Sequence, residues 1–299
     1  MPPVVSRTRS ATMSGNAPRV GTLVVQAPHE KGIVSAVSQL LARHGATVLD
    51  SAHFSDPASH TFFQRLQFDL AGVSDRVTLE RSLREVGERC AMHWRVWYAD
   101  RKRRIAILVS KQEHCLYDLL IRHRARELDC DVAMIISNHP EVSPIARHFG
   151  IPFHFLPVSS ENRRTQETAA WDLIDRAGVD LIVLARYMQI LSPEFVARYP
   201  QRIINVHHSF LPAFIGANPY RQAHERGVKM IGATSHYVTE ALDQGPIIEQ
   251  ATVRCAHRDC VEDLVRKGRE LEKHVLAAAV RWHLEDRVVA YDNKTVVFD

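Results

Sequence analysis

The residue types best suited to chemistry gather in one stretch of the second half of the chain. Residues 203–214 read Ile-Ile-Asn-Val-His-His-Ser-Phe-Leu-Pro-Ala-Phe, so an apolar run ends in Asn205, His207 and His208. Asn205 and His207 are two positions apart, and on a strand they therefore share one face. An amide donates hydrogen bonds, and an imidazole exchanges a proton near neutral pH. The pair indicates acid–base or oxyanion chemistry, although the same residues can simply hydrogen-bond a loop.

A carboxylate follows in a second stretch, residues 232–248. It contains His236 and Asp243, and Gly245-Pro246 then separates two apolar runs. An aspartate before Gly-Pro is a common turn residue. It can equally be a carboxylate on a rigid loop that pairs with a histidine and favours its charged form. The spacing alone leaves both interpretations open.

The apolar runs that precede these polar residues predict a parallel sheet. Four near-continuous runs, each followed by a loop and usually by a helical pattern, span residues 105–109, 132–137, 181–185 and 203–206. Such runs are typical of strands covered on both faces in an α/β domain. Ligands of open parallel sheets bind beyond the carboxyl ends of the strands. We therefore expect the site in the loops after Val109, Ala185 and Val206.

The first of these loops has no glycine. It reads Ser-Lys-Gln-Glu-His-Cys over residues 110–115. A phosphate or dinucleotide cradle needs glycines so that the backbone can approach the anion closely. The second domain therefore has Rossmann-like alternation without a nucleotide fingerprint. His114 and Cys115 could form a nucleophile pair, but neighbours in sequence rarely face one another, and a structural role is the preferred interpretation.

A smaller first domain is expected over residues 20–98. Its pattern predicts strand, helix, two strands, helix and strand, the ferredoxin-like order. The predicted elements span residues 20–26, 31–46, 47–54, 61–70, 77–87 and 94–98. The basic run Arg101–Arg104 marks a solvated linker at 99–104, with a catalytic domain over 105–299. Residues 1–19 read as a disordered leader.

Three motifs together resemble the folate-dependent formyltransferase superfamily. They are residues 183–192, residues 203–214, and His236 followed by Leu-Asp-Gln-Gly-Pro-Ile-Ile at 242–248. The His-His-Ser sequence, the glycine-free loop and the N-terminal extension are similar to the formyltetrahydrofolate deformylases. The extension itself resembles an ACT domain, a regulatory module. The resemblance covers nearly everything from about residue 20 onward.

The resemblance implies hydrolysis of 10-formyltetrahydrofolate to formate and tetrahydrofolate, which supplies formate for one-carbon and purine metabolism. It implies catalysis by Asn205, His207 and Asp243, with either Asp243 or His207 as the general base for water, and with no cofactor and no metal. A further set would bind the folate: Arg186, Tyr187, Met188, Gln189, Ile190, Leu191, Glu240 and Leu242. Supporting roles are expected for His236, His208, Ser110 and Lys111.

Two alternatives share these motifs. A transferase would pass the formyl group to an amine such as glycinamide ribonucleotide, but the glycine-free loop favours water as acceptor. A non-catalytic folate or amino-acid sensor would not need all three catalytic residues. At the ACT-like loop, His29 and Gly32 are candidates for an amino-acid effector site. The family commonly has an aspartate where this chain has His29, which leaves assembly as the other role of this domain.

Composition excludes several other classes. The net charge is +4 and the basic residues are scattered, so no nucleic-acid face is expected. The five cysteines show no two-residue spacing and their number is odd, which argues against a disulfide framework and fits the cytoplasm. No apolar run reaches the roughly 18 residues that span a membrane. We expect a homo-oligomer, a dimer or higher, because exposed sheet edges invite pairing.

Overall fold

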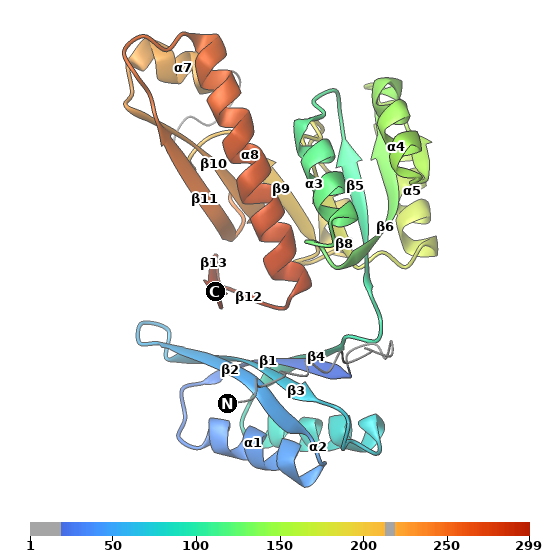
Figure 1. Ribbon diagram of the computed structural model, residues 1–299, viewed down its shortest axis with the longest axis vertical. Helices are drawn as coiled ribbons and strands as arrows, with labels where there is room; N and C mark the ends of the chain where they lie inside the picture. The colour runs from blue at the N-terminus through green and yellow to red at the C-terminus, as the bar shows by residue number, and fades with distance from the viewer. Residues whose placement is uncertain (1–18, 213–218) are drawn as a thin grey trace, which may run out of the picture. The chain divides into compact units, whose positions relative to one another are not determined.

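The computed structural model describes residues 19–212 and 219–299 and divides the chain into two compact units (Figure 1). The boundary lies between Arg101 and Lys102. The expected leader, apart from Arg19, and the end of the motif at residues 213–214 lie outside the described residues. Within the described ranges, every helix is too short or too polar to cross a membrane.

Unit 1 has the predicted ferredoxin-like order. Its elements are β1 (Val20–Pro28), α1 (Ile33–Arg43), β2 (Thr47–Asp56), β3 (Thr61–Asp69), α2 (Arg76–Arg89) and β4 (His93–Tyr98). The strands form an antiparallel sheet in the order β2-β3-β1-β4. Apolar residues of both helices, including Val37 and Leu83, join Leu23 and Leu66 of the sheet in one buried core. Helical spacing and strand alternation were sufficient to predict these elements.

Helix α1 is shorter than the predicted span of 31–46. Gly32 precedes it with a φ of +96°, and Gly45 follows it with a φ of +77°. Left-handed backbone ends a helix and favours glycine. A side chain at Gly45 would also place its Cβ 2.4 Å from the carbonyl oxygen of Gly72. The two glycines therefore limit the helix to Ile33–Arg43.

Unit 2 contains a seven-stranded, mostly parallel sheet in the order β11-β10-β9-β8-β5-β6-β7. The pairings among β5 to β9 are parallel, and β10 runs antiparallel to both β9 and β11. A β12-β13 hairpin follows helix α8. The strands are β5 (Arg103–Val109), β6 (Cys130–Ser137), β7 (Phe153–Phe155), β8 (Leu181–Leu184), β9 (Ile203–His207), β10 (Met230–Tyr237), β11 (Ile247–Arg254), β12 (Val288–Tyr291) and β13 (Lys294–Val297).

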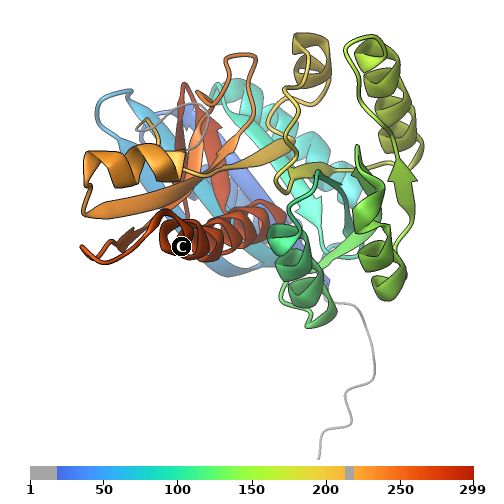
Figure 2. The same cartoon turned by 90° about the horizontal axis from the view of Figure 1, so that it is seen from above.

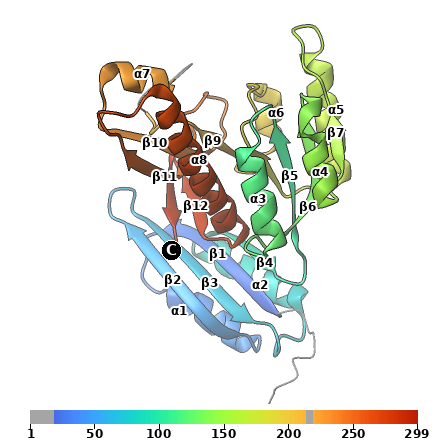
Figure 3. The same cartoon turned by 45° about the horizontal axis from the view of Figure 1, so that its top comes forward.

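Helices cover both faces of this sheet. They are α3 (His114–Arg124), α4 (Ser143–Phe149), α5 (Arg163–Arg176), α6 (Pro193–Arg198), α7 (Pro219–Arg226) and α8 (Val261–Leu284), with a short 3-10 turn η1 (Pro140–Val142). Helices α3, α4 and α8 contribute to one core cluster, and α5 and α6 contribute to another on the opposite face. Figure 2 shows α8 in dark red beside α3 in dark green, and the two are labelled as neighbours in Figure 3.

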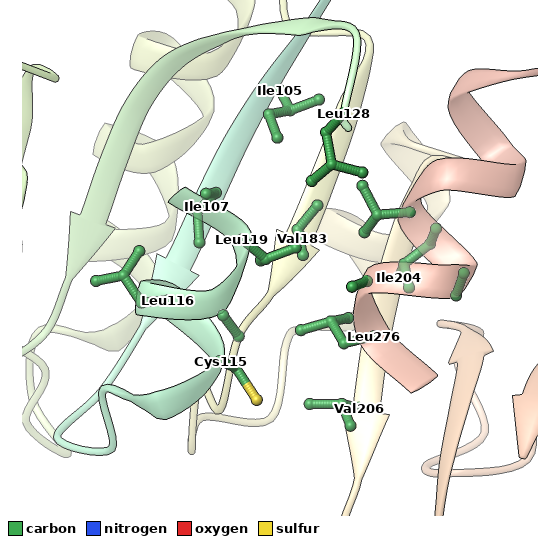
Figure 4. Close-up of a cluster of buried hydrophobic side chains, with 14 of the residues drawn as sticks. Ile105, Ile107, Cys115, Leu116, Leu119, Leu128, Val183, Ile204, Val206 and Leu276 are labelled. Atoms are coloured by element: carbon green, nitrogen blue, oxygen red, sulfur yellow. The ribbon is translucent and has the colours of Figure 1, made fainter. Parts of the chain in front are cut away.

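The strands explain why the predicted apolar runs are continuous. Ile105 and Ile107 of β5 point toward α3 and α8, together with Val183 of β8 and Ile204 of β9 (Figure 4). The alternate residues of β5, such as Leu108, are buried in the opposite cluster. A strand buried on both faces has no solvent-facing side, so its sequence does not alternate. This arrangement confirms the predicted α/β domain.

The predicted linker at 99–104 is wrong for its last two residues, Arg103 and Arg104, which belong to β5. Arg103 is the first residue of β5 and is 8% exposed. Its guanidinium donates to Asp286 at 2.7 Å and to the carbonyl oxygens of His283 and Leu284 at 2.7 and 2.9 Å. A run of basic residues is typical of a solvated segment, but a buried arginine is tolerated where its N–H groups are paired.

Candidate active site

A cavity of about 650 Å³ lies within unit 2, where β8 and β9 end. In the sheet, β5 lies between β6 and β8, so the chain continues from β5 to the strand on one side of it and later returns to the strand on its other side. Proteins of the α/β class bind ligands at such a switch point. Residues from the ends of β8 and β9, from the loop between β10 and β11, and from α8 line the cavity. Of the predicted site residues, fourteen line this cavity or contact a residue that does.

His207 and Asp243 form the central pair. The imidazole Nδ1 atom lies 3.2 Å from the Oδ2 atom of Asp243, and both side chains are largely buried. The hydrogen bond from His207, and then the proximity of His236, hold the pKa of Asp243 well below its usual value. The Nε2 atom of His207 is buried and has no hydrogen-bond partner among the described residues. The ring is therefore oriented by a carboxylate at one nitrogen and is available for chemistry at the other.

Asn205 is positioned by the neighbouring strand. In the antiparallel pairing of β9 and β10, Asn205 lies directly opposite His236, and its Nδ2 atom is 3.3 Å from Nε2 of that histidine. The other ring nitrogen of His236 donates to the carbonyl oxygen of Tyr237 at 2.9 Å. His236 is 2% exposed, so its orientation is fixed by packing as well as by hydrogen bonds. The Nε2 atom of His236 also lies 3.7 Å from Oδ1 of Asp243.

The loop that carries Asp243 is held by its Gly-Pro sequence. Asp243 itself has a φ of +55°, and non-glycine residues in that region often occur at functional sites. A Cβ atom at Gly245 would lie 1.7 Å from the carbonyl oxygen of Tyr237. The amide of Tyr237 donates to the carbonyl oxygen of Pro246 at 2.9 Å. Close packing of this turn on β10 brings the carboxylate to the two histidines.

The loop after β8 forms one wall of the cavity. Its members are Arg186, Tyr187, Met188, Gln189, Ile190 and Leu191. Met188 and Ile190 are 57% and 58% exposed, and Leu242 across the cavity is 55% exposed. Glu240 also lines the cavity. Exposed apolar side chains around a cavity offer a surface for a flat aromatic ligand.

Ser110 supports this loop from behind. Its hydroxyl donates to Asn138 at 2.7 Å and accepts from the backbone N–H of Met188 at 3.0 Å. Ser110 is 3% exposed and does not line the cavity. Lys111, the other residue of this loop expected to support the site, is exposed and is not among the lining residues. Ser110 therefore holds the backbone of the loop after β8 through the N–H of Met188.

A buried ionic network around Arg186 also borders the cavity. Arg186 donates through Nη1 to Nδ1 of His208 at 2.5 Å and through Nε to Gln112 at 2.9 Å. The same Nε atom lies 3.5 Å from Glu272 of α8. His114 and Tyr220 contact the two Glu272 oxygens at 2.7 and 2.8 Å. Burial raises the pKa of Glu272, but the hydrogen bond from His114 and the charge of Arg186 outweigh it, and the net shift is downward.

His114, Cys115 and Glu272 are close enough to hold a metal ion. The Glu272 oxygens already bind protein partners, and the adjacent Arg186 cation disfavours a second positive charge. Cys115 is 1% exposed, and burial raises the pKa of its thiol well above the usual value. A thiol is a poor nucleophile under such conditions. His114 is thus a hydrogen-bond partner of Glu272 and the first residue of α3, whereas the sequence placed it in a loop.

Sequence reasoning missed one side of the cavity. The lining includes residues from the loop after β5, from α7 and from α8 that no motif marked: Gln112, Tyr220, Val265, Arg269 and Glu272. One signal was available for Glu272, because an acid is buried in the apolar stripe of α8, where Val275, Leu276 and Ala279 follow it. Long charged side chains are rarely buried without partners. His29 and Gly32 belong to unit 1.

Comparison with known proteins identifies the family of the chain. A family model described as formyl transferase matches residues 103–280. The formyltetrahydrofolate deformylase of Bacillus subtilis is 49% identical over 281 residues, which are 93% of this chain and 94% of that protein. Crystal structures of formyltetrahydrofolate deformylases are similar too. The one from Pseudomonas syringae has a TM-score of 0.92 at 44% identity and covers 96% of both chains. The one from Burkholderia mallei has a TM-score of 0.90 at 43% identity, over 94% of this chain and 100% of that chain. The chain belongs to the formyltetrahydrofolate deformylase family.

Proposed function

We propose that the chain hydrolyses 10-formyltetrahydrofolate to formate and tetrahydrofolate, with Asn205, His207 and Asp243 as catalytic residues. The observation that carries this proposal is the His207–Asp243 pair at 3.2 Å with the buried Nε2 atom of His207 left without a described partner. An imidazole arranged in this way can accept a proton from water and return it to a leaving group. The family of the chain supports the folate as substrate.

We propose separate tasks for the two residues of this pair. Asp243 has a pKa well below its usual value, so it is a weak base and a stable anion. It orients His207 and favours the imidazolium that forms when Nε2 takes a proton from the attacking water. The water oxygen bonds to the formyl carbon, and the carbonyl oxygen becomes an oxyanion. His207 then gives its proton to the folate nitrogen as the C–N bond breaks.

Asn205 faces the oxyanion in this proposal. Its side-chain amide is held in place by His236 at 3.3 Å, so one N–H group can point at the oxygen before charge develops on it. Donors fixed in advance stabilise a tetrahedral intermediate more than donors that must reorient. His236 acts through Asn205 and Asp243 and is a positioning residue.

The folate ring would bind against the exposed apolar side chains of the loop after β8. Met188 and Ile190 would pack on the ring, Leu242 would cover its other side, and backbone groups of Arg186–Leu191 would bind its polar edge. This loop is anchored by the hydrogen bond from Met188 to Ser110. The chemistry described above uses only side chains and water, so we propose that no cofactor or metal takes part.

The test is release of formate from 10-formyltetrahydrofolate by the purified protein with no amine present. We expect steady turnover that is lost in His207→Ala and retained in His148→Ala, which changes an exposed histidine of α4. Formate that appears only when an amine such as glycinamide ribonucleotide is added would support a formyltransferase instead. Tight folate binding without turnover in either assay would support a sensor.

We also propose that unit 1 is an ACT-like domain with a regulatory or assembly role. The loop between β1 and α1 is exposed, and Nδ1 of His29 lies 3.0 Å from the hydroxyl of Ser55. Gly32 completes this loop with its positive φ. These groups would contact an amino-acid effector. The edge strand β2 carries the exposed apolar residues Val48, Leu49 and Phe54, which would favour pairing with a second copy.

The proposed site of action is the cytoplasm, where formate released by this reaction would feed one-carbon and purine metabolism. All five cysteines are free thiols, as expected for a reducing compartment.

A further inference from the structure

His208 has its ring proton on one particular nitrogen. The Nη1 atom of Arg186 lies 2.5 Å from Nδ1 of His208. A guanidinium has five N–H donors and no acceptor, so Nδ1 must be the acceptor of this bond. In a neutral imidazole whose Nδ1 accepts, the proton is on Nε2. The contact therefore makes Nε2 of His208 an N–H donor.

Arg186, which sets this tautomer, is held in one orientation. Its side chain is 7% exposed, and the guanidinium is held by Gln112 at 2.9 Å and by Glu272 at 3.5 Å. Glu272 is itself held by hydrogen bonds to His114 and Tyr220. Removing any of these partners from a buried charge is costly, so the network keeps Arg186 directed at His208.

His208 also remains neutral. Burial first, and then the electrostatic effects of Arg186 and His207, lower its pKa to about 4, against a smaller opposite effect of Glu272 and Asp243. Near pH 7 the ring can therefore donate from Nε2 but does not compete with His207 for the proton of the attacking water.

The two histidines are neighbours in the cavity wall. Their rings stack with centroids 5.1 Å apart and planes at 25°, and both line the cavity. Nδ1 of His207 is engaged by Asp243, and Nδ1 of His208 by Arg186. Neither Nε2 atom has a hydrogen-bond partner in the described part of the chain. One of these atoms is an acceptor for a proton and the other is a fixed donor.

We infer that His208 donates a second hydrogen bond to the oxyanion, beside Asn205, and that Arg186 and Glu272 position it for this task. The inference rests on the proposed function. An oxyanion is stabilised best by several donors fixed in advance, and a neutral N–H stabilises the charge without itself losing a proton. Glu272 is then a positioning residue, 29 positions after Asp243 in the chain.

The first test compares His208→Leu with His208→Gln. Leucine removes the donor, and we expect kcat to fall about 100-fold with KM nearly unchanged, as for the loss of one oxyanion donor. Glutamine has an amide N–H₂ that can replace the Nε2 donor and an oxygen that can accept from Arg186, and we expect it to recover at least part of kcat. A Leu variant with normal kcat, or one in which only KM rises, would overturn the inference.

The second test is independent of turnover. Nitrogen-15 NMR of the imidazole rings distinguishes an N–H nitrogen from a bare one. In the substrate-free wild type we expect His208 to have its proton on Nε2, and in Glu272→Gln a smaller excess of that tautomer. Detection of the Nδ1–H tautomer in the wild type would refute the inference even if formate is released. Absence of formate release would instead refute the proposed function, whatever the NMR shows.

Discussion

The Nδ1 atom of His207 lies 3.2 Å from Oδ2 of Asp243, and this contact separates the two ring nitrogens by function. One nitrogen is committed to a carboxylate that is ionised throughout the physiological range, because its pKa is well below the usual value. The other is buried and lacks a described partner. A histidine oriented in this way can take up and release a proton at Nε2.

Asp243→Asn should reduce kcat by about 10²- to 10⁴-fold, the range of a positioned acid–base pair. Asparagine keeps the shape of the side chain but no longer stabilises the imidazolium of His207. The measurement is formate release at saturating 10-formyltetrahydrofolate. Asp172→Asn, at an exposed position of α5, is the matched control and should behave as the wild type. Normal turnover in Asp243→Asn would show that the carboxylate has no part in proton transfer.

The lowered pKa of His208 predicts that the stability of the folded chain depends on pH in a definite direction. This pKa is lowered from 6.5 to about 4 in the folded chain, so between these values the unfolded state binds a proton that the folded state does not. Stability should therefore fall as the pH decreases from about 6.5 toward 4 and should be insensitive to this group above that window. Urea unfolding of the wild type and of His208→Gln across this range measures the difference. The part of the pH dependence of the unfolding free energy that is due to His208 should be absent in the variant. The same pH dependence in both proteins would contradict the lowered pKa of His208.

Ser110→Ala should affect folate binding more than chemistry. The substitution removes the acceptor of the Met188 N–H and the donor to Asn138, and one hydrogen bond contributes about 0.5–1.5 kcal/mol. We expect KM for the folate to rise about 2- to 10-fold with a smaller change in kcat. Lys111→Ala, at the exposed neighbouring position, is the control. A large loss of kcat with unchanged KM would place Ser110 in the chemical step instead.

Arg103→Met should destabilise unit 2 by about 3–5 kcal/mol, because it leaves Asp286 as a buried charge that has lost its arginine. Lys102→Met is the control. Its ion pair with Asp129 is exposed, with side chains 64% and 80% accessible, and such pairs contribute about 1 kcal/mol or less. Denaturant unfolding of both variants gives the comparison. Equal free energies of unfolding for the two variants would contradict this prediction, because the buried pair would then contribute no more than the exposed pair.

Much of this molecule was determined by local sequence. The alternation and helical spacing in residues 20–98 predicted six elements, and the two helices each bury one apolar face in the core of unit 1. The continuous apolar runs predicted the parallel strands of unit 2. Asn205 and His207 followed from the two-residue period of a strand, and the position of the site followed from where those strands end.

Only the tertiary structure decided which polar groups meet. His236 reaches Asn205 because β10 pairs antiparallel with β9, a register that neither motif specifies. Arg103 can be buried because Asp286 and two carbonyl groups bind its guanidinium. These partners are 180 or more positions away in the sequence and are brought to it by the fold. Glu272 reaches Arg186 and His114 because α8 packs beside α3. Charges and hydrogen bonds act over a few ångströms of space, and the local patterns of a sequence carry information about such distances only within one helix or strand.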